Sequence, residues 1–181
     1  MRNKEACRYW HASCYMYKVV VCFVCWQGET VSKEIQPGII SGERSTPMNM
    51  MLIDDDQDCI LGLAGVLEPT GHSCEMFTVP EQAVQLYDGQ HYDIVITDMK
   101  MPGMNGIEVL RLIRERNPAA KVIIITGYGD AEGAMSAVKF GAYAFFCKPI
   151  NVAELIEMIE KIDGELNLEQ QSKLEQKGLT V

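Results

Sequence analysis

Five side chains with complementary chemistry stand at the ends of short runs of strand-forming residues. They are the carboxylates of Asp54, Asp55 and Asp98, the hydroxyl of Thr126 and the amine of Lys148. If these runs are parallel strands of one sheet, all five groups gather at its carboxyl edge, where open α/β sheets place their ligands. Clustered carboxylates, one amine and one hydroxyl make a site for a hard cation and a phosphoryl group.

The elements that must position these groups follow from a fivefold alternation of strand and helix patterns after Met48. The expected strands cover residues 50–53, 71–76, 92–97, 121–125 and 144–147. Between and after them, apolar residues recur at helical spacing. Such alternation implies a parallel sheet with right-handed crossovers. The predicted fold is therefore α/β, a doubly wound five-stranded parallel sheet in the flavodoxin-like order 2-1-3-4-5.

Local signals predict where several helices begin and end. Thr78 and Glu81 have the spacing of a capping box that opens a helix through residue 87, and Asn151 and Glu154 repeat it before the last helix. Gly141 suits the C-terminal cap of the helix over 130–140.

The ordered constellation resembles the receiver domain of two-component response regulators. Each motif alone is weak, but all of them occur in the right order and each stands at a strand end. The matching residues are Asp54-Asp55, Asp98, Met101-Pro102-Gly103-Met104-Asn105-Gly106, Thr126-Gly127 and Lys148-Pro149. The resemblance covers about residues 48 to 164. The stretches 126–130 and 141–143 are most similar to receivers of the nitrogen-regulation and nitrogen-fixation types.

The resemblance implies a role for each acidic residue. Asp98 is the expected phosphoacceptor, because a carboxylate can accept a phosphoryl group to give an acyl phosphate. Asp55 is expected to bind a metal ion directly and Asp54 mainly through water, with Asp98 and the backbone carbonyl of Lys100 as further ligands. Oxygen-only ligands favour Mg2+ or Mn2+. The alternative is that these carboxylates belong to a solvated acidic loop without a function. Their position at the ends of two separate strands argues against that alternative.

The remaining site residues are assigned in the same way. Lys148 is expected to neutralise the side of the phosphoryl group that faces away from the metal ion. Thr126 is expected to hydrogen-bond the new phosphoryl oxygen and to start a conformational switch. Phe145 is either the aromatic residue that moves with that threonine or plain core packing, and the sequence leaves both readings open. The turn from Lys148 into the last helix predicts a cis peptide bond before Pro149.

Composition separates the first 47 residues from the rest. Residues 1–47 hold six of the 16 Lys and Arg but only four of the 25 Asp and Glu, together with four of the seven cysteines and both tryptophans. We therefore expect residues 1–47 to be an N-terminal extension that is not a folded domain, 48–164 to be the receiver, and 165–181 to be a polar tail. Cys22 and Cys25 have the spacing of zinc ligands. Because the second pair, Cys7 and Cys14, is spaced too widely for a usual zinc knuckle, an extension that is not a folded domain is the better interpretation.

Charge and apolar content restrict the partners. A formal net charge of −9 argues against a nucleic-acid surface. The apolar run 19–26 is too short to span a membrane, which needs roughly 20 apolar residues. The odd number of cysteines, three of them within expected core elements, favours a reducing compartment and hence a cytoplasmic protein.

The predicted function is a stand-alone phosphoacceptor switch rather than an enzyme with its own substrate. Its expected partners are a sensor histidine kinase or histidine phosphotransfer protein and an unidentified downstream protein, and a homodimer is left open. One alternative is a flavodoxin-like cofactor binder, but Asp54 and its acidic neighbours would repel a mononucleotide phosphate. Another is an aspartyl phosphatase. It would want a second acid two residues after Asp98, where the chain has Lys100.

Overall fold

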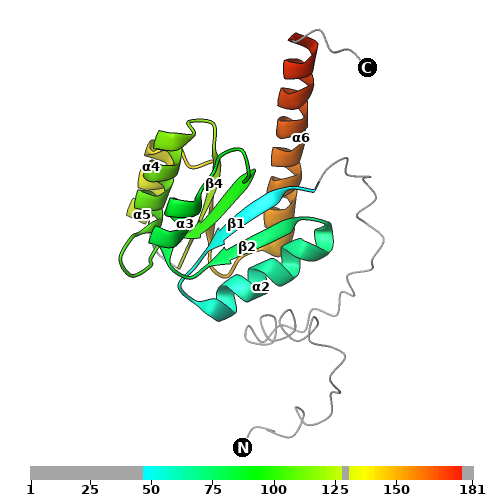
Figure 1. Cartoon of the computed structure of the whole chain (residues 1–181). Coiled ribbons are helices and arrows are strands. Elements are labelled where there is room, and N and C mark those ends of the chain that lie inside the picture. The colour runs from blue at the N-terminus through cyan, green and yellow to red at the C-terminus, as the bar shows by residue number, and fades with distance from the viewer. Residues whose placement is uncertain (1–46, 128–130, 177–181) are drawn as a thin grey trace, which may run out of the picture. The chain divides into compact units, whose positions relative to one another are not determined.

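A computed structural model describes residues 47–127 and 131–176 of the chain. These residues form a five-stranded, all-parallel sheet in the order β2-β1-β3-β4-β5 (Figure 1). The strands are β1 (Asn49–Ile53), β2 (Ser73–Phe77), β3 (Ile94–Asp98), β4 (Lys121–Thr126) and β5 (Ala144–Cys147). The sheet class and the strand order predicted from the sequence are both confirmed.

Helices connect the strands and cover both faces of the sheet. They are α2 (Gln57–Leu67), α3 (Pro80–Leu86), α4 (Gly106–Arg116), α5 (Ala131–Lys139) and α6 (Val152–Gln176), with a short 3-10 helix η1 (Glu68–Thr70) before β2. Helices α3, α4 and α5 pack on one face, and α2 and α6 pack on the other (Figure 1). No helix among the described residues is long and apolar enough to cross a membrane.

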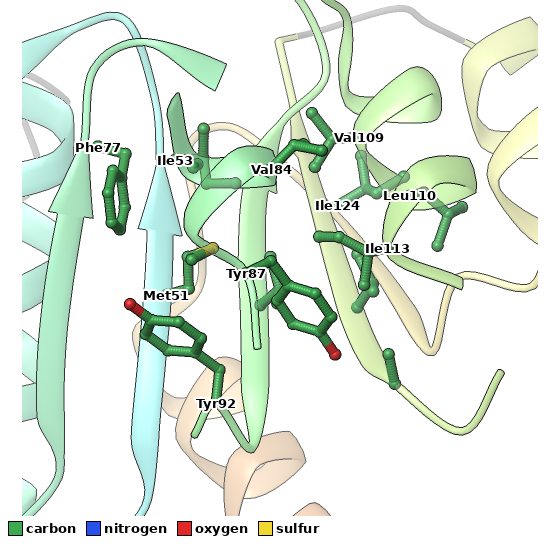
Figure 2. Packing of buried hydrophobic residues seen from close by; sticks show 14 of the residues in the cluster. Met51, Ile53, Phe77, Val84, Tyr87, Tyr92, Val109, Leu110, Ile113 and Ile124 are labelled. Atoms are coloured by element: carbon green, nitrogen blue, oxygen red, sulfur yellow. The ribbon is translucent and has the colours of Figure 1, made fainter. Parts of the chain in front are cut away.

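Two hydrophobic cores lie on the two faces of the sheet, because successive strand residues point to opposite sides. Met51 and Ile53 of β1 face the core under α3 and α4, which also contains Leu110 and Ile124 (Figure 2). Met50 of β1 faces the core under α2 and α6. Covering both faces explains why the central strands are nearly continuous apolar runs.

The strand register places the ends of the central strands at one edge. Ile53 of β1 lies beside Thr97 of β3, so that Asp54 and Asp98 follow at the same level. On the other side of β3, Thr126 at the end of β4 pairs with Cys147, the residue before Lys148. The register therefore brings together polar residues that are up to 94 positions apart in the chain.

The start of α3 differs from the sequence prediction. Thr78 does not form a capping box: the helix begins at Pro80, its N-cap is Val79, and no side chain caps it. The residue before a proline is restricted to extended backbone, and Val79 has φ −121° and ψ 108°. Proline at the first helical position thus shifts the cap by one residue, away from Thr78.

Helix α6 continues past residue 164, where the sequence suggested that the receiver ends and a polar tail begins. Leu166 packs against the core on the α2 and α6 face. Glu165 accepts hydrogen bonds from Lys121 Nζ and Tyr143 Oη, both at 2.7 Å. These tertiary contacts extend the helix through Gly164, although glycine disfavours a helix by roughly 1 kcal/mol relative to alanine.

Deleting residues 1–47 is expected to leave a folded domain. The sheet, both cores and the carboxyl edge are built entirely from residues 48 onward among those described. The N-terminal extension, including Cys22 and Cys25, lies outside the described residues. We expect the truncated and full-length proteins to show the same cooperative thermal transition by circular dichroism, since the described core is built from residues 48 onward. A truncated chain without a cooperative transition would show that the extension contributes to the core.

Candidate functional site

The carboxylate of Asp98 is the centre of the site. Asp98 is the last residue of β3 and is 7% exposed. Its Oδ1 lies 2.6 Å from Lys148 Nζ, and its Oδ2 accepts a hydrogen bond of 2.6 Å from the backbone N–H of Lys100. Both carboxylate oxygens are therefore held, one by a side chain from the end of β5 and the other by the backbone just after β3.

Lys148 bridges two of the predicted acidic residues. Its Nζ lies 2.8 Å from Asp54 Oδ2 as well as 2.6 Å from Asp98 Oδ1. Its backbone N–H donates to the carbonyl of Thr126 at 2.6 Å, and the Lys148–Pro149 peptide bond is cis, as predicted. Partial burial lowers the pKa of Lys148, but the hydrogen bonds to Asp54 and Asp98 outweigh burial and raise the pKa above its ordinary value.

The three consecutive acids after β1 have three different environments. Asp54 is partly buried, and its Oδ1 accepts the N–H of Asp56 at 3.0 Å. Asp55 is exposed and makes no hydrogen bond or ion pair with the described residues. Asp56 caps α2: its side chain accepts the N–H groups of Cys59 at 3.3 Å and Asp58 at 2.9 Å, and these bonds lower the pKa of Asp56.

The donor set suits a hard cation by its chemistry, because carboxylate and backbone carbonyl oxygens are the ligands that Mg2+ prefers. In residues 47–127 and 131–176, however, no three His, Cys, Asp or Glu side chains are arranged to hold a metal ion. Asp54 and Asp98 are held by Lys148 instead. Asp55, which has no partner in the described part of the chain, is the carboxylate most available to a cation.

Thr126 brings a buried hydroxyl without a partner to the same edge. It ends β4 and is fully buried, and its Oγ1 makes no hydrogen bond within the described residues. Such an unsatisfied group is uncommon in proteins and marks a place where a ligand or a moving segment can supply the missing bond. A Cβ built on Gly127, the next residue, would meet nothing within 4 Å, so there is open space at that position.

Phe145 and the residues after Gly127 complete the comparison with the sequence predictions. Phe145 is partly buried and packs against the core under α3, α4 and α5. This contact fits its reading as core packing and leaves its role in switching as a prediction. Residues 128–130, which belong to the motif after Thr126, lie outside the described residues.

Two contributions to the site were not anticipated from the sequence. The N–H of Lys100 holds Asp98, whereas only its carbonyl was expected to take part, and no side-chain pattern reveals a backbone donor. Asp56 acts as the N-cap of α2 rather than only as part of an acidic cluster. Aspartate directly before a helical pattern is a recognised capping signal and could have identified that role.

The sequence profile of the response regulator receiver domain matches residues 50–160, which is more than half of the chain. The chain belongs to this family. Receivers are signalling domains of two-component systems, and a phosphorylated aspartate and Mg2+ are typical of them. The family predicted from the ordered motifs is thereby confirmed.

Curated relatives include three transcriptional regulators. The phosphoglycerate transport regulator PgtA of Salmonella typhimurium is 35% identical over 112 residues, which are 62% of this chain and 27% of the relative. The C4-dicarboxylate transport regulator DctD of Rhizobium meliloti is 32% identical over 124 residues, or 68% and 27% of the two chains. The regulator NtrC of Escherichia coli is 29% identical over 122 residues, or 67% and 26%. The chain thus spans about a quarter of the length of these relatives.

Solved structures of receiver domains superpose on almost their whole length. A receiver domain from Clostridium thermocellum matches with a TM-score of 0.64 at 30% identity, covering 67% of this chain and 98% of that one. A CheY-like receiver from Methanospirillum hungatei matches with a TM-score of 0.64 at 26% identity, covering 68% and 99%.

Replacing Lys148 by methionine is expected to destabilise the protein in a pH-dependent way. At neutral pH the variant should lose about 1.5–3 kcal/mol of unfolding free energy, because two neighbouring carboxylates lose a charged donor. Folding raises the pKa of Lys148. Its contribution is therefore complete below the unfolded value of 10.5 and fades as the pH rises above it.

Denaturant unfolding of both proteins at several pH values measures this difference. The exposed Lys139→Met is the matched control and should change the stability by less than about 0.5 kcal/mol at every pH. A Lys148→Met penalty that is absent at neutral pH, or that stays constant well above pH 10.5, would contradict the ion-pair account.

Proposed function

We propose that this receiver accepts a phosphoryl group on Asp98 from a histidine kinase or a histidine phosphotransfer protein. The observation that carries the proposal is the buried Asp98 carboxylate, oriented by Lys148 and by the Lys100 N–H and lying near the unpartnered Thr126 hydroxyl. An Asp98 oxygen forms a bond to phosphorus while the phosphorus–nitrogen bond of phosphohistidine breaks. The electron pair of that bond stays on the imidazole, and the product is an acyl phosphate.

The chain's own residues position the reactants and balance their charge, which is most of what phosphoryl transfer requires. Lys148 neutralises charge on the acceptor side before the reaction and on the phosphoryl oxygens after it. Asp55, Asp54, Asp98 and the Lys100 carbonyl are the proposed ligands of Mg2+ or Mn2+. When bound, that cation would supply further neutralisation of the phosphoryl oxygens.

The proposed switch is the formation of the hydrogen bond that Thr126 lacks. A phosphoryl oxygen on Asp98 offers the acceptor for the Thr126 hydroxyl, and the open space at Gly127 gives the strand end room to move. Phe145, a partly buried residue that packs against the core, is the proposed aromatic residue that moves together with Thr126. A local change of charge would thus bias a two-state element, as modification switches generally do.

The partners follow from the same chemistry. A phosphohistidine-bearing protein supplies the phosphoryl group, and a downstream protein reads the altered surface. The acidic balance of residues 48–181 favours protein partners over direct contact with nucleic acid. A cytoplasmic location is proposed because histidine kinases present their phosphohistidine there.

Asp98→Asn is expected to abolish phosphorylation and to keep the fold. The amide cannot form an acyl phosphate, but it preserves the shape of the side chain. Incubation with acetyl phosphate and Mg2+, followed by intact-mass spectrometry, should show one added phosphoryl group on the wild type and none on Asp98→Asn. Asp163→Asn, a carboxylate of similar type on α6, is the control and should be phosphorylated like the wild type. A mass increase on Asp98→Asn would disprove the assignment.

Mg2+ is expected to raise the thermal midpoint, because a ligand that binds only the folded state stabilises it, by about 1.4 kcal/mol at ten times its dissociation constant. Asp55→Ala should lose this Mg2+-dependent increase. Asp56→Ala should keep it, although losing the cap of α2 lowers its midpoint in the absence of metal. Equal Mg2+ responses in the wild type and Asp55→Ala would exclude Asp55 as a ligand.

A further inference from the structure

The loop between β3 and α4 holds the Asp98 oxygen that Lys148 does not. The Lys100 N–H donates to Asp98 Oδ2 at 2.6 Å. A backbone donor cannot adjust by rotating a side chain, so the position of this oxygen follows the position of the loop backbone. Whatever fixes the loop therefore contributes to the orientation of the carboxylate.

The beginning of the loop is fixed by the sheet and the core. The Met99 N–H donates to the carbonyl of Ile125 at 2.7 Å, and the Gly106 N–H closes the loop onto the Met99 carbonyl at 3.0 Å. Met99 and Met101 are buried in the core under α3 and α4. The orientation of the loop therefore depends on where its other end joins α4.

Gly106, the first residue of α4, lies directly against the backbone of Asp98. A Cβ on Gly106 would collide with the Asp98 carbonyl oxygen and would come to 3.0 Å from Met99 Cα. Both obstacles are backbone atoms, so no side-chain rotation could relieve the collision. The close approach of α4 to Asp98 is thus possible only with glycine at this position.

A capping box holds this first turn of α4. The Asn105 side chain accepts the N–H groups of Ile107 and Glu108, both at 3.0 Å, and Glu108 Oε2 accepts the Asn105 N–H at 2.9 Å. None of these bonds involves Asp98 itself. They determine where α4 begins and hence where the loop that carries Lys100 ends.

We propose that Asn105, Glu108 and Gly106 are positioning residues for Asp98. They hold the first turn of α4 against the Asp98 backbone and so keep the Lys100 N–H on the carboxylate. The inference rests on the proposed role of Asp98 as phosphoacceptor. Displacing a reacting group by about 1 Å can slow a reaction by up to roughly 100-fold. A change in the exposed cap of α4 can therefore lower the rate at which Asp98 is phosphorylated.

The test compares four variants of the full chain. Asn105→Ala removes the cap, and Asn105→Ser restores a capping oxygen. Gly106→Ala moves α4 away from Asp98. Asn151→Ala is the matched control, because Asn151 also accepts a backbone N–H, that of Ala153 at 3.1 Å, at the start of another helix.

Three measurements separate positioning from stability. The rate of acyl phosphate formation is measured with saturating Mg2+ over a range of acetyl phosphate concentrations. The Lys100 amide resonance is followed by NMR in the absence of donor, because a hydrogen bond to a carboxylate moves that proton downfield. Thermal midpoints show how far each variant is destabilised.

We expect Asn105→Ala to lower the maximal rate by about 5- to 50-fold, with little change in the half-saturating donor concentration. Its Lys100 resonance should move upfield. Asn105→Ser should restore both properties to within about twofold of the wild-type rate. Asn151→Ala should lose a similar amount of stability but keep the wild-type rate and resonance. Gly106→Ala should slow the reaction at least as much as Asn105→Ala. If Gly106→Ala does not fold, the comparison of Asn105→Ala with Asn105→Ser tests the proposal alone.

The proposal is overturned if Asn105→Ala keeps the wild-type rate and the wild-type Lys100 resonance, or if Asn105→Ala and Asn151→Ala are slowed equally. Absence of phosphorylation in the wild type would instead overturn the proposed function. In that case the Lys100 resonance still shows whether Asn105 orients Asp98, because its measurement needs no phosphodonor.

Discussion

The ammonium group of Lys148 lies between two carboxylates at the carboxyl edge of the sheet, and the arrangement of the site depends on it. Asp54 and Asp98 are brought to the same level by the pairing of β1 with β3, where their like charges would repel. Lys148 contacts both at 2.8 Å and 2.6 Å and neutralises that repulsion. Because Lys148 is anchored through its backbone to Thr126, the same interaction links β5 to β4.

This neutralisation has a consequence for the metal ion. Asp54 is engaged by Lys148 in the present structure, and the carboxylates do not converge as a ligand set within the described residues. A cation bound at this edge would therefore have to compete with Lys148 for Asp54, whereas the exposed Asp55 would be available to it. Among the described residues of the site, the buried hydroxyl of Thr126 has no hydrogen-bond partner. A phosphoryl group on Asp98 would supply the acceptor missing there.

Much of the fold could be predicted from the sequence because the strands are buried on both faces and end in turn or polar residues. The strand order, the cap at Gly141 (φ +80°) and the cis bond before Pro149 agree with the sequence prediction. The predicted start of α3 was wrong because Pro80 is the first helical residue and makes Val79 the N-cap in place of Thr78. Local signals also could not show that α6 continues through Gly164, since the contacts that extend it reach Lys121 and Tyr143.

The site likewise has features that could be predicted from the sequence and features that could not. Residue types at strand ends identified Asp54, Asp98, Thr126 and Lys148 as neighbours, because a parallel sheet aligns its carboxyl ends. Which oxygen each donor holds depends on tertiary structure. The pairing of Lys148 with Asp54 and the Lys100 backbone contact became visible only in the structure. Three adjacent acids that look equivalent in the sequence are separated there into an ion-paired, an exposed and a capping residue.

Direct mapping of the modified residue is the sharpest test of the account. Borohydride reduces an aspartyl phosphate to homoserine, which peptide mass spectrometry can assign to one position in the chain. After treatment with acetyl phosphate and Mg2+, the account predicts homoserine at position 98 and aspartate at positions 54, 55 and 56. Homoserine at one of the acids after β1, with position 98 unmodified, would contradict the claim that Asp98 is the phosphoacceptor.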